Sequence, residues 1–320
     1  MRVAVVDLGT NTTRLLVADV VDGRVDELLR RTEITRLGEG VDQRRRLLPL
    51  PIARVRNVLA DYRRELELLG AERTLAIATS AIRDAENGEA FLGEVEWSYG
   101  FTTRLLSGEE EGLLTFRGAT SGRTLAEDTL VVDLGGGSTE LVAGDDDGVQ
   151  FHHSLDIGAV RLTERFLASD PPEQPELDDC ARAVRSLLAE RVPDDVRVRV
   201  ARAIGVAGTT TTLAALHLEL PEYDRERVDG HRLSRDAIEE QLGRLASLPL
   251  AERREVPALE PERAPVIVAG AVILREVVDY FGLREIEVSE RDILDGAAVE
   301  AAALPAPTEG EAPPGAYTCC

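Results

Sequence analysis

Two short stretches of this chain share one pattern: D-L-G-T-N-T-T-R-L at residues 7–15 and D-L-G-G-G-S-T-E-L at residues 133–141. In both, β-branched apolar residues precede the aspartate and apolar residues follow the last position. Each copy therefore predicts a strand, a tight turn and a second strand. Glycine, serine and threonine in the turn let backbone N–H groups approach an anion closely, and the aspartate can hold a metal ion or a water molecule. Two such hairpins facing each other would clamp a chain of phosphates and its metal ion.

A third stretch, G-V-A-G-T-T at residues 205–210, predicts a strand, a glycine turn and the start of a helix. The free N–H groups of that helix would point at an anion. An ordinary strand-to-helix turn capped by Thr209 explains this stretch equally well. Two ordinary turns with aspartate as a turn former could also explain the hairpins, but their shared register favours a phosphate site.

The composition restricts the class of protein. A chain of 320 residues that is 43% apolar and 30% charged is long enough for two domains with separate cores. No apolar run approaches the ~20 residues that span a bilayer, and no signal-peptide pattern opens the chain, so we expect a cytoplasmic protein. Cys180, Cys319 and Cys320 are too few for a disulfide framework or a zinc site, and the role of the last two stays open.

The charge restricts the partners. A formal net charge of −22 argues against nonspecific binding to nucleic acid or to an anionic membrane. All 37 basic residues are arginine, which excludes a P-loop lysine and a Schiff-base lysine. A phosphate ligand would therefore be held by backbone N–H groups, hydroxyls, arginine forks and divalent cations.

Strands and helices alternate around the duplicated hairpin, which predicts an α/β fold with two related domains and a ligand cleft between them. We expect the first domain at 1–124, the second at 125–304 and a disordered tail at 305–320. The last helix, near 292–304, either stays with the second domain or packs back on the first.

Several charged residues leave alternatives open. Glu109, Glu110 and Glu111 follow Ser107 in the first turn of a predicted helix, where acidic residues favour the helix dipole and one could act as a general base. Arg83 follows a strand end and could equally be a surface residue. Arg14 could be a salt-bridge partner, and the run Arg44–Arg46 is better explained as a solvated loop than as a basic landing patch.

Six motifs occur in a fixed order and carry a resemblance. Besides the two hairpins, they are A-T-S-A-I-R-D-A-E-N, S-G-E-E-E-G, G-V-A-G-T-T-T-T and V-S-E-R-D-I-L-D-G-A-A. Together they resemble the exopolyphosphatase and guanosine pentaphosphate phosphohydrolase family, within the acetate-and-sugar-kinase, Hsp70 and actin superfamily. The resemblance covers roughly residues 1–303. It implies two duplicated actin-like, ribonuclease H-like domains with a cleft between them, and a short two-domain member of the family.

The resemblance also implies roles for individual residues. It makes Glu111 the catalytic base, and Arg83 matches a family arginine that contacts the substrate chain. Mg²⁺ or another divalent cation would be bound by Asp7, Asp133 and Glu140. The substrate-binding positions would be Gly9, Thr10, Asn11, Thr12, Thr13, Arg14, Arg83, Gly135, Gly136, Gly137, Ser138, Thr139, Gly208 and Thr209.

The activity implied is release of terminal orthophosphate from inorganic polyphosphate by metal-assisted attack of water. The alternatives are hydrolysis of the 5′-phosphate of guanosine pentaphosphate (pppGpp) with the same apparatus, and a non-catalytic sensor of either ligand. An ATP-dependent kinase is disfavoured by the acidic run 109–111 and by the lack of an acceptor-sugar motif. Chain-length preference and homodimer formation stay open.

Overall fold

The computed structural model describes residues 1–125 and 127–305. They form two compact units: Met1–Ser121 together with the chain from Ile293 onward, and Gly122–Asp292. Each unit contains a mixed β-sheet and covering helices, which confirms the predicted two-domain α/β class. The first break lies close to the expected one at 124/125, but the last helix groups with the first unit and not with 125–304. Of the expected tail at 305–320, residues 306–320 lie outside the described chain.

The sheet of the first unit has the strand order β3-β2-β1-β4-β5. β1 is antiparallel to β2 and parallel to β4, so the predicted hairpin continues into a parallel arrangement. The elements of this unit are β1 (Arg2–Leu8), β2 (Thr12–Val21), β3 (Arg24–Ile34), α1 (Val41–Arg44), α2 (Pro49–Leu68), β4 (Arg73–Ala78), α3 (Ser80–Asp84), α4 (Gly88–Tyr99), β5 (Thr102–Leu105), α5 (Gly108–Thr120) and α14 (Ile293–Ala303).

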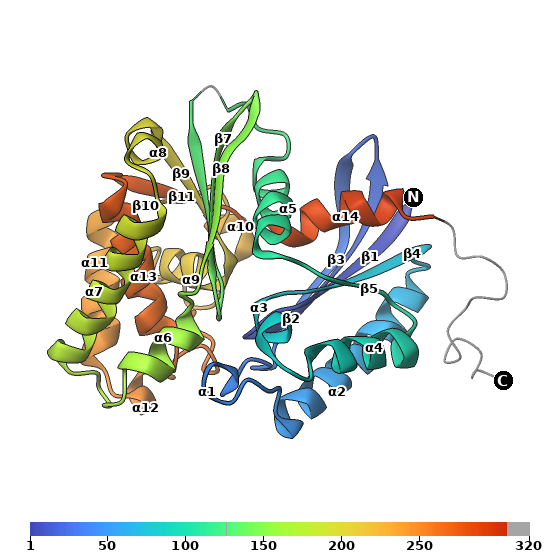
Figure 1. Ribbon diagram of the computed structural model, residues 1–320, viewed down its shortest axis with the longest axis horizontal. Coiled ribbons are helices and arrows are strands. Elements are labelled where there is room, and N and C mark those ends of the chain that lie inside the picture. The colour runs from blue at the N-terminus through green and yellow to red at the C-terminus, as the bar shows by residue number, and fades with distance from the viewer. Residues whose placement is uncertain (126, 306–320) are drawn as a thin grey trace. The chain divides into compact units, whose positions relative to one another are not determined.

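Both faces of this sheet are covered. Val3 and Val5 of β1 point to one face and pack with α5 and α14. Ala4 and Val6 point to the other face and pack with α2 and α4, because successive side chains of a strand alternate. Figure 1 shows α2 and α4 on one side of the sheet and α5 and α14 on the other. A strand buried on both sides accounts for the continuous apolar run that precedes Asp7.

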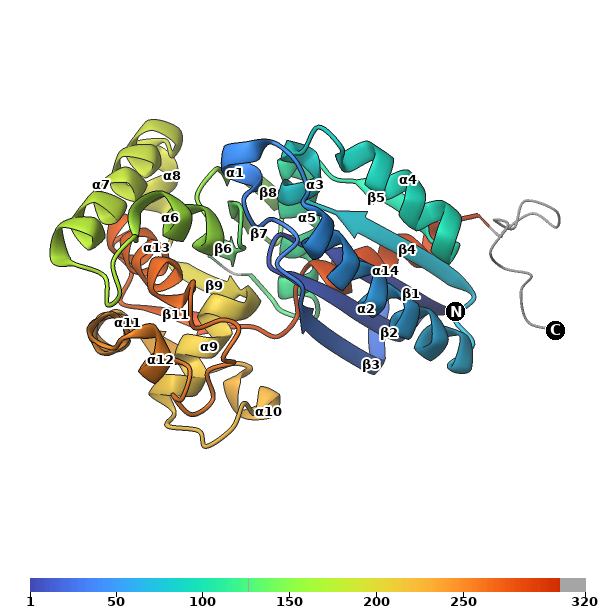
Figure 2. The ribbon, with the colours of Figure 1, turned by 90° about the horizontal axis from the view of Figure 1, so that it is seen from below.

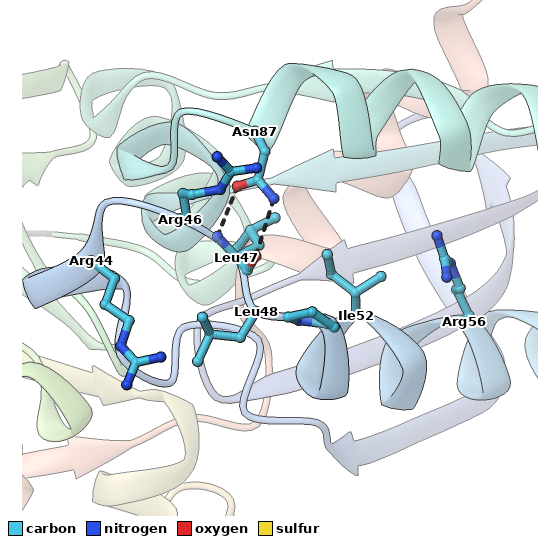
Figure 3. A pocket seen from close by; sticks show the side chains of 8 residues that line it. Arg44, Arg46, Leu47, Leu48, Ile52, Arg56 and Asn87 are labelled. Atoms are coloured by element: carbon cyan, nitrogen blue, oxygen red, sulfur yellow. Dashed lines mark hydrogen bonds between the residues drawn. The ribbon is translucent and has the colours of Figure 1, made fainter.

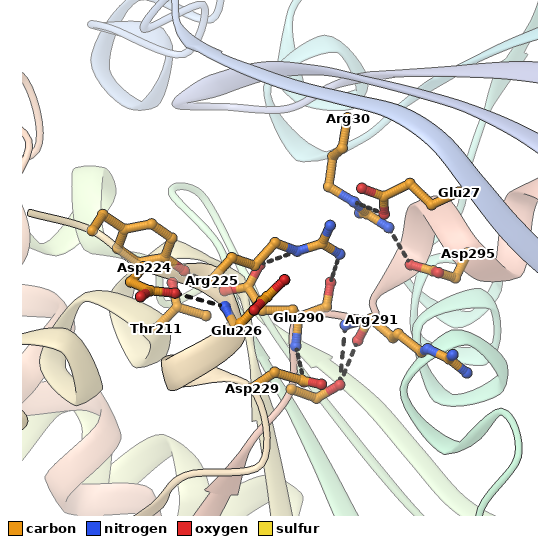
Figure 4. Close-up of polar contacts among 12 residues, drawn as sticks. Glu27, Arg30, Thr211, Asp224, Arg225, Glu226, Asp229, Glu290, Arg291 and Asp295 are labelled. Atoms are coloured by element: carbon orange, nitrogen blue, oxygen red, sulfur yellow. Dashed lines mark hydrogen bonds and ion pairs between the residues drawn. The ribbon is translucent and has the colours of Figure 1, made fainter.

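The helix α14 is fixed to the first unit by a close backbone approach and an ion pair. A Cβ atom at Gly296 would lie 2.0 Å from the carbonyl oxygen of Leu114, so α14 touches the backbone of α5 where no side chain fits. Arg30 of β3 lies 2.8 Å from the Asp295 carboxylate and 2.9 Å from that of Glu27, as Figure 4 shows. The D-G pair of the last motif therefore explains why this helix joins the first unit.

The loop between α1 and α2 is also fixed to its neighbours. The Asn87 amide accepts a hydrogen bond from the Leu47 N–H at 2.8 Å and donates one to the Leu47 carbonyl at 3.1 Å (Figure 3). The Glu86 N–H donates to the Arg45 carbonyl at 2.8 Å. Arg44 thus ends α1, and Arg45 and Arg46 follow on a loop whose backbone is hydrogen-bonded to the segment at 86–87.

The sheet of the second unit has the order β10-β11-β9-β6-β7-β8. β6 is antiparallel to β7 and parallel to β9, the same arrangement as around β1. The elements are β6 (Thr129–Leu134), β7 (Thr139–Asp145), β8 (Gly148–Leu155), α6 (Ala159–Phe166), α7 (Gln174–Arg191), α8 (Asp194–Arg199), β9 (Arg202–Val206), α9 (Ala207–His217), α10 (Arg225–Val228), β10 (Arg232–Ser234), α11 (Arg235–Ser247), α12 (Leu250–Arg253), α13 (Ile267–Tyr280) and β11 (Glu285–Val288).

The core of the second unit is one apolar cluster formed by β6, β7 and the helices α6, α7, α9, α11 and α13. Figure 2 shows α13 lying among α6, α7 and α11. The burial of α13 on nearly all sides agrees with its apolar sequence from Ile267 to Leu274. The end of this unit is fixed by Glu290, which accepts from Arg225 Nε at 3.0 Å and donates its N–H to Asp229 at 2.9 Å (Figure 4).

Candidate functional site

The two predicted hairpins have the same strand register. In the first, Asp7 pairs with Arg14 across β1 and β2, and Leu8 pairs with Thr13. In the second, Asp133 pairs with Glu140 across β6 and β7, and Leu134 pairs with Thr139. The shared register inferred from the two sequence copies is therefore present in three dimensions.

The turns of the two hairpins also match. The Gly9 N–H donates to the Thr12 carbonyl at 3.0 Å, and the Gly135 N–H donates to the Ser138 carbonyl at 3.0 Å. A Cβ atom at either glycine would come within 3.0 or 3.2 Å of that same carbonyl. Glycine is needed at both positions because the turn closes tightly on itself.

The hairpins differ in the residue opposite the aspartate. Arg14 donates from Nε and Nη2 to Asp7 Oδ2, at 2.9 and 2.6 Å. Glu140 takes the equivalent place beside Asp133, and both carboxylates are buried. Glu140 Oε1 accepts a hydrogen bond from Ser154 at 2.8 Å. The first hairpin thus neutralises its aspartate, whereas the second places two acidic residues together.

The carbonyl groups of the second turn are bound by the segment that enters α6. The N–H of Ala159 donates to the Gly135 carbonyl at 3.0 Å, and the N–H groups of Val160 and Arg161 donate to the Gly136 carbonyl at 2.9 and 3.1 Å. The buried Arg161 side chain donates from Nε to the Gly137 carbonyl at 2.7 Å. Three successive carbonyls are therefore held by one helix start.

Gly158 permits this contact. A Cβ atom there would lie 2.4 Å from the carbonyl group of Gly136, so the two backbones touch. The Thr139 hydroxyl, expected to bind substrate, donates to the Ile157 carbonyl at 2.6 Å. The side chain of Thr139 thus helps to hold the entry to α6.

The first turn is held in the same way by residues after β3. The N–H groups of Thr35 and Arg36 donate to the Asn11 carbonyl, and the Gly38 N–H donates to the Thr10 carbonyl at 2.8 Å. A Cβ atom at Gly38 would lie 2.2 Å from Thr10 Cγ2. The hydroxyls of Thr13 and Thr35 lie 2.9 Å apart and form a hydrogen bond. Thr13, like Thr139, was predicted to bind substrate, and its side chain instead contacts the supporting segment.

The segments that bind the two turns, near Gly38 and Gly158, were not predicted from the sequence. The signal was present, because an apolar residue followed by glycine occurs shortly after the third strand in both units, as Leu37-Gly38 and as Ile157-Gly158. The duplication therefore extends beyond the hairpins to the segments that support them.

Two predicted ligand-binding segments contain a buried polar atom with no hydrogen-bond partner in the described chain. These atoms are Asn11 Oδ1 in the first turn and Thr210 Oγ1 at the start of α9. Leaving a buried polar group unsatisfied costs about 1–3 kcal/mol, so such groups are expected where a ligand or water completes the site.

The third segment has no separate turn, because β9 ends at Val206 and α9 begins at Ala207. Ala207 has a φ of 65°, which is strained for a residue with a Cβ atom. A Cβ atom at Gly208 would lie 1.7 Å from a guanidinium nitrogen of Arg263. Arg263, which was not predicted from the sequence as a site residue, therefore lies directly against the predicted phosphate-binding backbone.

The geometry of α5 gives Glu109, Glu110 and Glu111 three different surroundings. Ser107 accepts from the Glu110 N–H while Glu110 accepts from the Ser107 N–H at 2.8 Å, which makes Glu110 part of a capping box. Its hydrogen bonds with Ser107 and its ion pair with Arg104 lower the pKa of Glu110 to about 2. Glu109 is exposed, and Glu111 is the buried member of the three.

Glu111 has a basic neighbour from the predicted site. Arg83, the last basic residue of α3, donates from Nη1 to Glu111 Oε2 at 3.1 Å and to the Leu106 carbonyl at 2.8 Å. Two residues that the sequence suggested for separate reasons thus lie in contact.

The described part of the chain contains no group of three or more histidine, cysteine or acidic side chains that could hold a metal ion by themselves. None of its helices is long and apolar enough to cross a bilayer.

Comparisons with known proteins identify relatives of this chain. Residues 16–303 match the model of the Ppx/GppA phosphatase family. The chain is 40% identical to exopolyphosphatase 2 of Mycobacterium tuberculosis, over 94% of this chain and 98% of the relative. The crystal structure of an exopolyphosphatase-like protein superposes with a TM-score of 0.88 at 35% identity, covering 94% of this chain and 98% of the other. The Ppx/GppA family member of Aquifex aeolicus superposes with a TM-score of 0.79 at 33% identity, covering 95% and 98%.

The family model extends over most of both units and begins just after the first hairpin motif at residues 7–15. The matches also confirm the expected actin-like fold, since the solved relatives share it across both sheets. The chain belongs to the Ppx/GppA phosphatase family.

Proposed function

We propose that this protein is an exopolyphosphatase, which releases terminal orthophosphate from inorganic polyphosphate. The observation that carries the proposal is the repetition of one type of turn in both units, with matching register, turn hydrogen bonds and supporting segments. The name and 40% identity of the mycobacterial relative support the same substrate.

The turns are suited to bind phosphate because their carbonyl oxygens are occupied. In the first turn, N–H groups of the supporting segment donate to the carbonyls of Thr10 and Asn11. In the second turn, they donate to the carbonyls of Gly135 and Gly136. Apart from those of Gly9 and Gly135, which close the turns, the N–H groups of the turns then remain as donors for phosphate oxygens. The unsatisfied Asn11 and Thr210 side chains would add polar contacts.

Glu111 is the proposed general base. It lies in the first turn of α5, buried, with Arg83 beside its carboxylate. A cation next to a carboxylate favours the charged form, which is the form that accepts a proton from water. Arg83 would also present donors to a substrate phosphate, since one guanidinium carries five N–H groups.

The acidic pair Asp133 and Glu140 fits a magnesium ion. Mg²⁺ in phosphate-processing sites binds one or two carboxylates and completes its shell with water and substrate oxygens. The pair supplies hard oxygen donors in one buried place, whereas Asp7 is already compensated by Arg14. We therefore propose Asp133 and Glu140 as the principal ligands. When bound, the ion would neutralise charge on the phosphate oxygens.

The test is phosphate release from polyphosphate, pppGpp and ATP measured side by side at equal terminal phosphate concentration. The proposal predicts the highest kcat/KM with polyphosphate. A clear preference for pppGpp would assign the alternative activity, hydrolysis of pppGpp. A preference for ATP would contradict both the exopolyphosphatase and the pppGpp phosphohydrolase assignment. Binding of polyphosphate without release by a folded protein, with Mg²⁺ present, would indicate a sensor.

A further inference from the structure

We propose a second anion site in the first unit, formed by the arginine run and suited to a nucleoside phosphate. A cavity of about 480 Å³ is lined by Arg44, Arg46, Leu47, Leu48, Pro49, Ile52, Arg56 and Asn87. None of these residues belongs to the phosphate turns, to α9 or to the Arg83–Glu111 pair. The size lies within the range of small-molecule sites, which is roughly 300–1,000 Å³.

Two arginines of the cavity differ from most arginines of this chain in their surroundings. With 59 acidic residues and 37 arginines, most arginines have a carboxylate partner. Arg56 follows this rule and binds both oxygens of Glu94, at 2.6 and 2.7 Å. Across residues 1–125 and 127–305, no carboxylate partner is found for Arg44 or Arg46, although both are exposed in a chain of net charge −22. Two uncompensated guanidinium groups beside one cavity favour an anionic ligand.

The remaining wall of the cavity is apolar. Leu47 is buried, and Leu48 and Ile52 are half-buried beside Pro49. An inorganic phosphate chain gains nothing from such a surface, because its oxygens are strongly hydrated. A nucleoside phosphate uses both parts: its phosphates bind the guanidinium groups, and its flat base lies on the apolar side chains or stacks on an arginine. Figure 3 shows Leu48 and Ile52 between the arginines of the loop and Arg56 of α2.

The site is preformed, which lowers the entropy cost of binding. Asn87 binds the Leu47 backbone on both sides, and the Glu86 N–H binds the Arg45 carbonyl. The cavity therefore joins two segments of the chain. One leads back through α1 to Gly38 and the first phosphate turn, and the other leads back through α3 to Arg83. A ligand that contacts both segments is placed to change the activity proposed for the phosphate turns.

The experiment is calorimetric titration of the full chain with GDP, ADP, guanosine and inorganic pyrophosphate. The test variant is Arg44→Ala with Arg46→Ala. The matched control is Arg24→Ala with Arg64→Ala, which removes the same charge from arginines that are 76% and 71% exposed and lie outside the cavity. We expect the test variant to weaken nucleoside diphosphate binding by about tenfold or more, as for the loss of charge-assisted hydrogen bonds. The control should bind as the wild type does.

Two further measurements locate the ligand and identify its chemistry. Hydrogen exchange with GDP should protect 44–52 and 86–87, and Ile52→Ser should weaken GDP but not pyrophosphate. Equal affinity in the two double variants, or protection confined to 9–14, 135–139 and 207–211, would overturn the site. Pyrophosphate binding as tightly as GDP, with no effect of Ile52→Ser, would overturn the nucleoside part. Because these readouts need no turnover, failure of the proposed hydrolase activity would leave them interpretable.

Discussion

Arg83 Nη1 lies 3.1 Å from Glu111 Oε2 and 2.8 Å from the Leu106 carbonyl oxygen. The main-chain contact fixes the guanidinium at the start of α5, where it meets the buried carboxylate of the acidic triplet. The arginine thus lies beside the proposed base, and the contact with the substrate chain that the family resemblance implied stays a prediction.

Glu111→Gln should lower turnover by about 10²–10⁴-fold, as expected for loss of a general base, with little change in melting temperature. Glu110→Gln is the matched variant, because it removes the adjacent carboxylate from the capping box. It should retain turnover and lose about 1 kcal/mol of stability. Phosphate release and thermal unfolding of both variants check this. Near wild-type turnover in Glu111→Gln would exclude it as the base.

The stabilisation by Glu110 should depend on pH. Its folded pKa is about 2, below the ordinary value of 4.5, because Ser107 and Arg104 bind the charged form. A lowered pKa gives stability that is complete above the unfolded value and is lost as pH falls toward the folded value. The stability difference between wild type and Glu110→Gln should therefore shrink between about pH 4.5 and pH 2. Denaturant unfolding across this range measures it, and a constant difference would mean that the carboxylate charge is not what stabilises the cap.

Arg83→Ala should move the acidic limb of the plot of kcat/KM against pH to higher pH. The reason is that a neighbouring cation favours the ionised form of a carboxylate, here that of Glu111. Arg64→Ala, an exposed arginine paired with Asp61, is the control and should leave the profile in place. Steady-state rates on a short and a long polyphosphate distinguish the two roles. A larger rise of KM for the long chain with an unmoved limb would make Arg83 only a substrate contact.

Gly296→Ala should destabilise the protein by about 1–3 kcal/mol, because the new Cβ atom would lie 2.0 Å from the Leu114 carbonyl. Gly93→Ala is the matched helical control, with no atom within 4 Å of the added Cβ, and should stabilise by about 0.5–1 kcal/mol. Thermal unfolding gives both values. An unchanged melting temperature for Gly296→Ala would show that α14 can move away from α5 without cost.

Two substitutions test the second hairpin. Arg161→Met removes the Nε–H that binds the buried Gly137 carbonyl, so the turn should shift and kcat/KM should fall by about tenfold to a hundredfold. Arg165→Met, on the exposed side of α6, is the control. KM and kcat are measured separately with the melting temperature. A fall in stability with unchanged kinetic constants would make Arg161 a residue of the fold alone.

Much of this arrangement was predictable from the sequence. The hairpins, their common register and the two α/β units follow from local patterns, because alternating burial, glycine turns and strand ends depend on neighbouring residues. The start of α5 at Ser107 was predictable for the same reason, since a capping box is contained within four residues.

Only the tertiary structure decided which partners these elements meet. The capping-box pattern distinguishes Glu110 by sequence, but only the packing of α5 leaves Glu109 exposed and buries Glu111. The pairing of Arg14 with Asp7 and the placement of α14 beside α5 likewise depend on contacts between distant segments. Local periodicity specifies which face of an element is apolar, whereas the residue that meets that face is set by the packing of the whole unit.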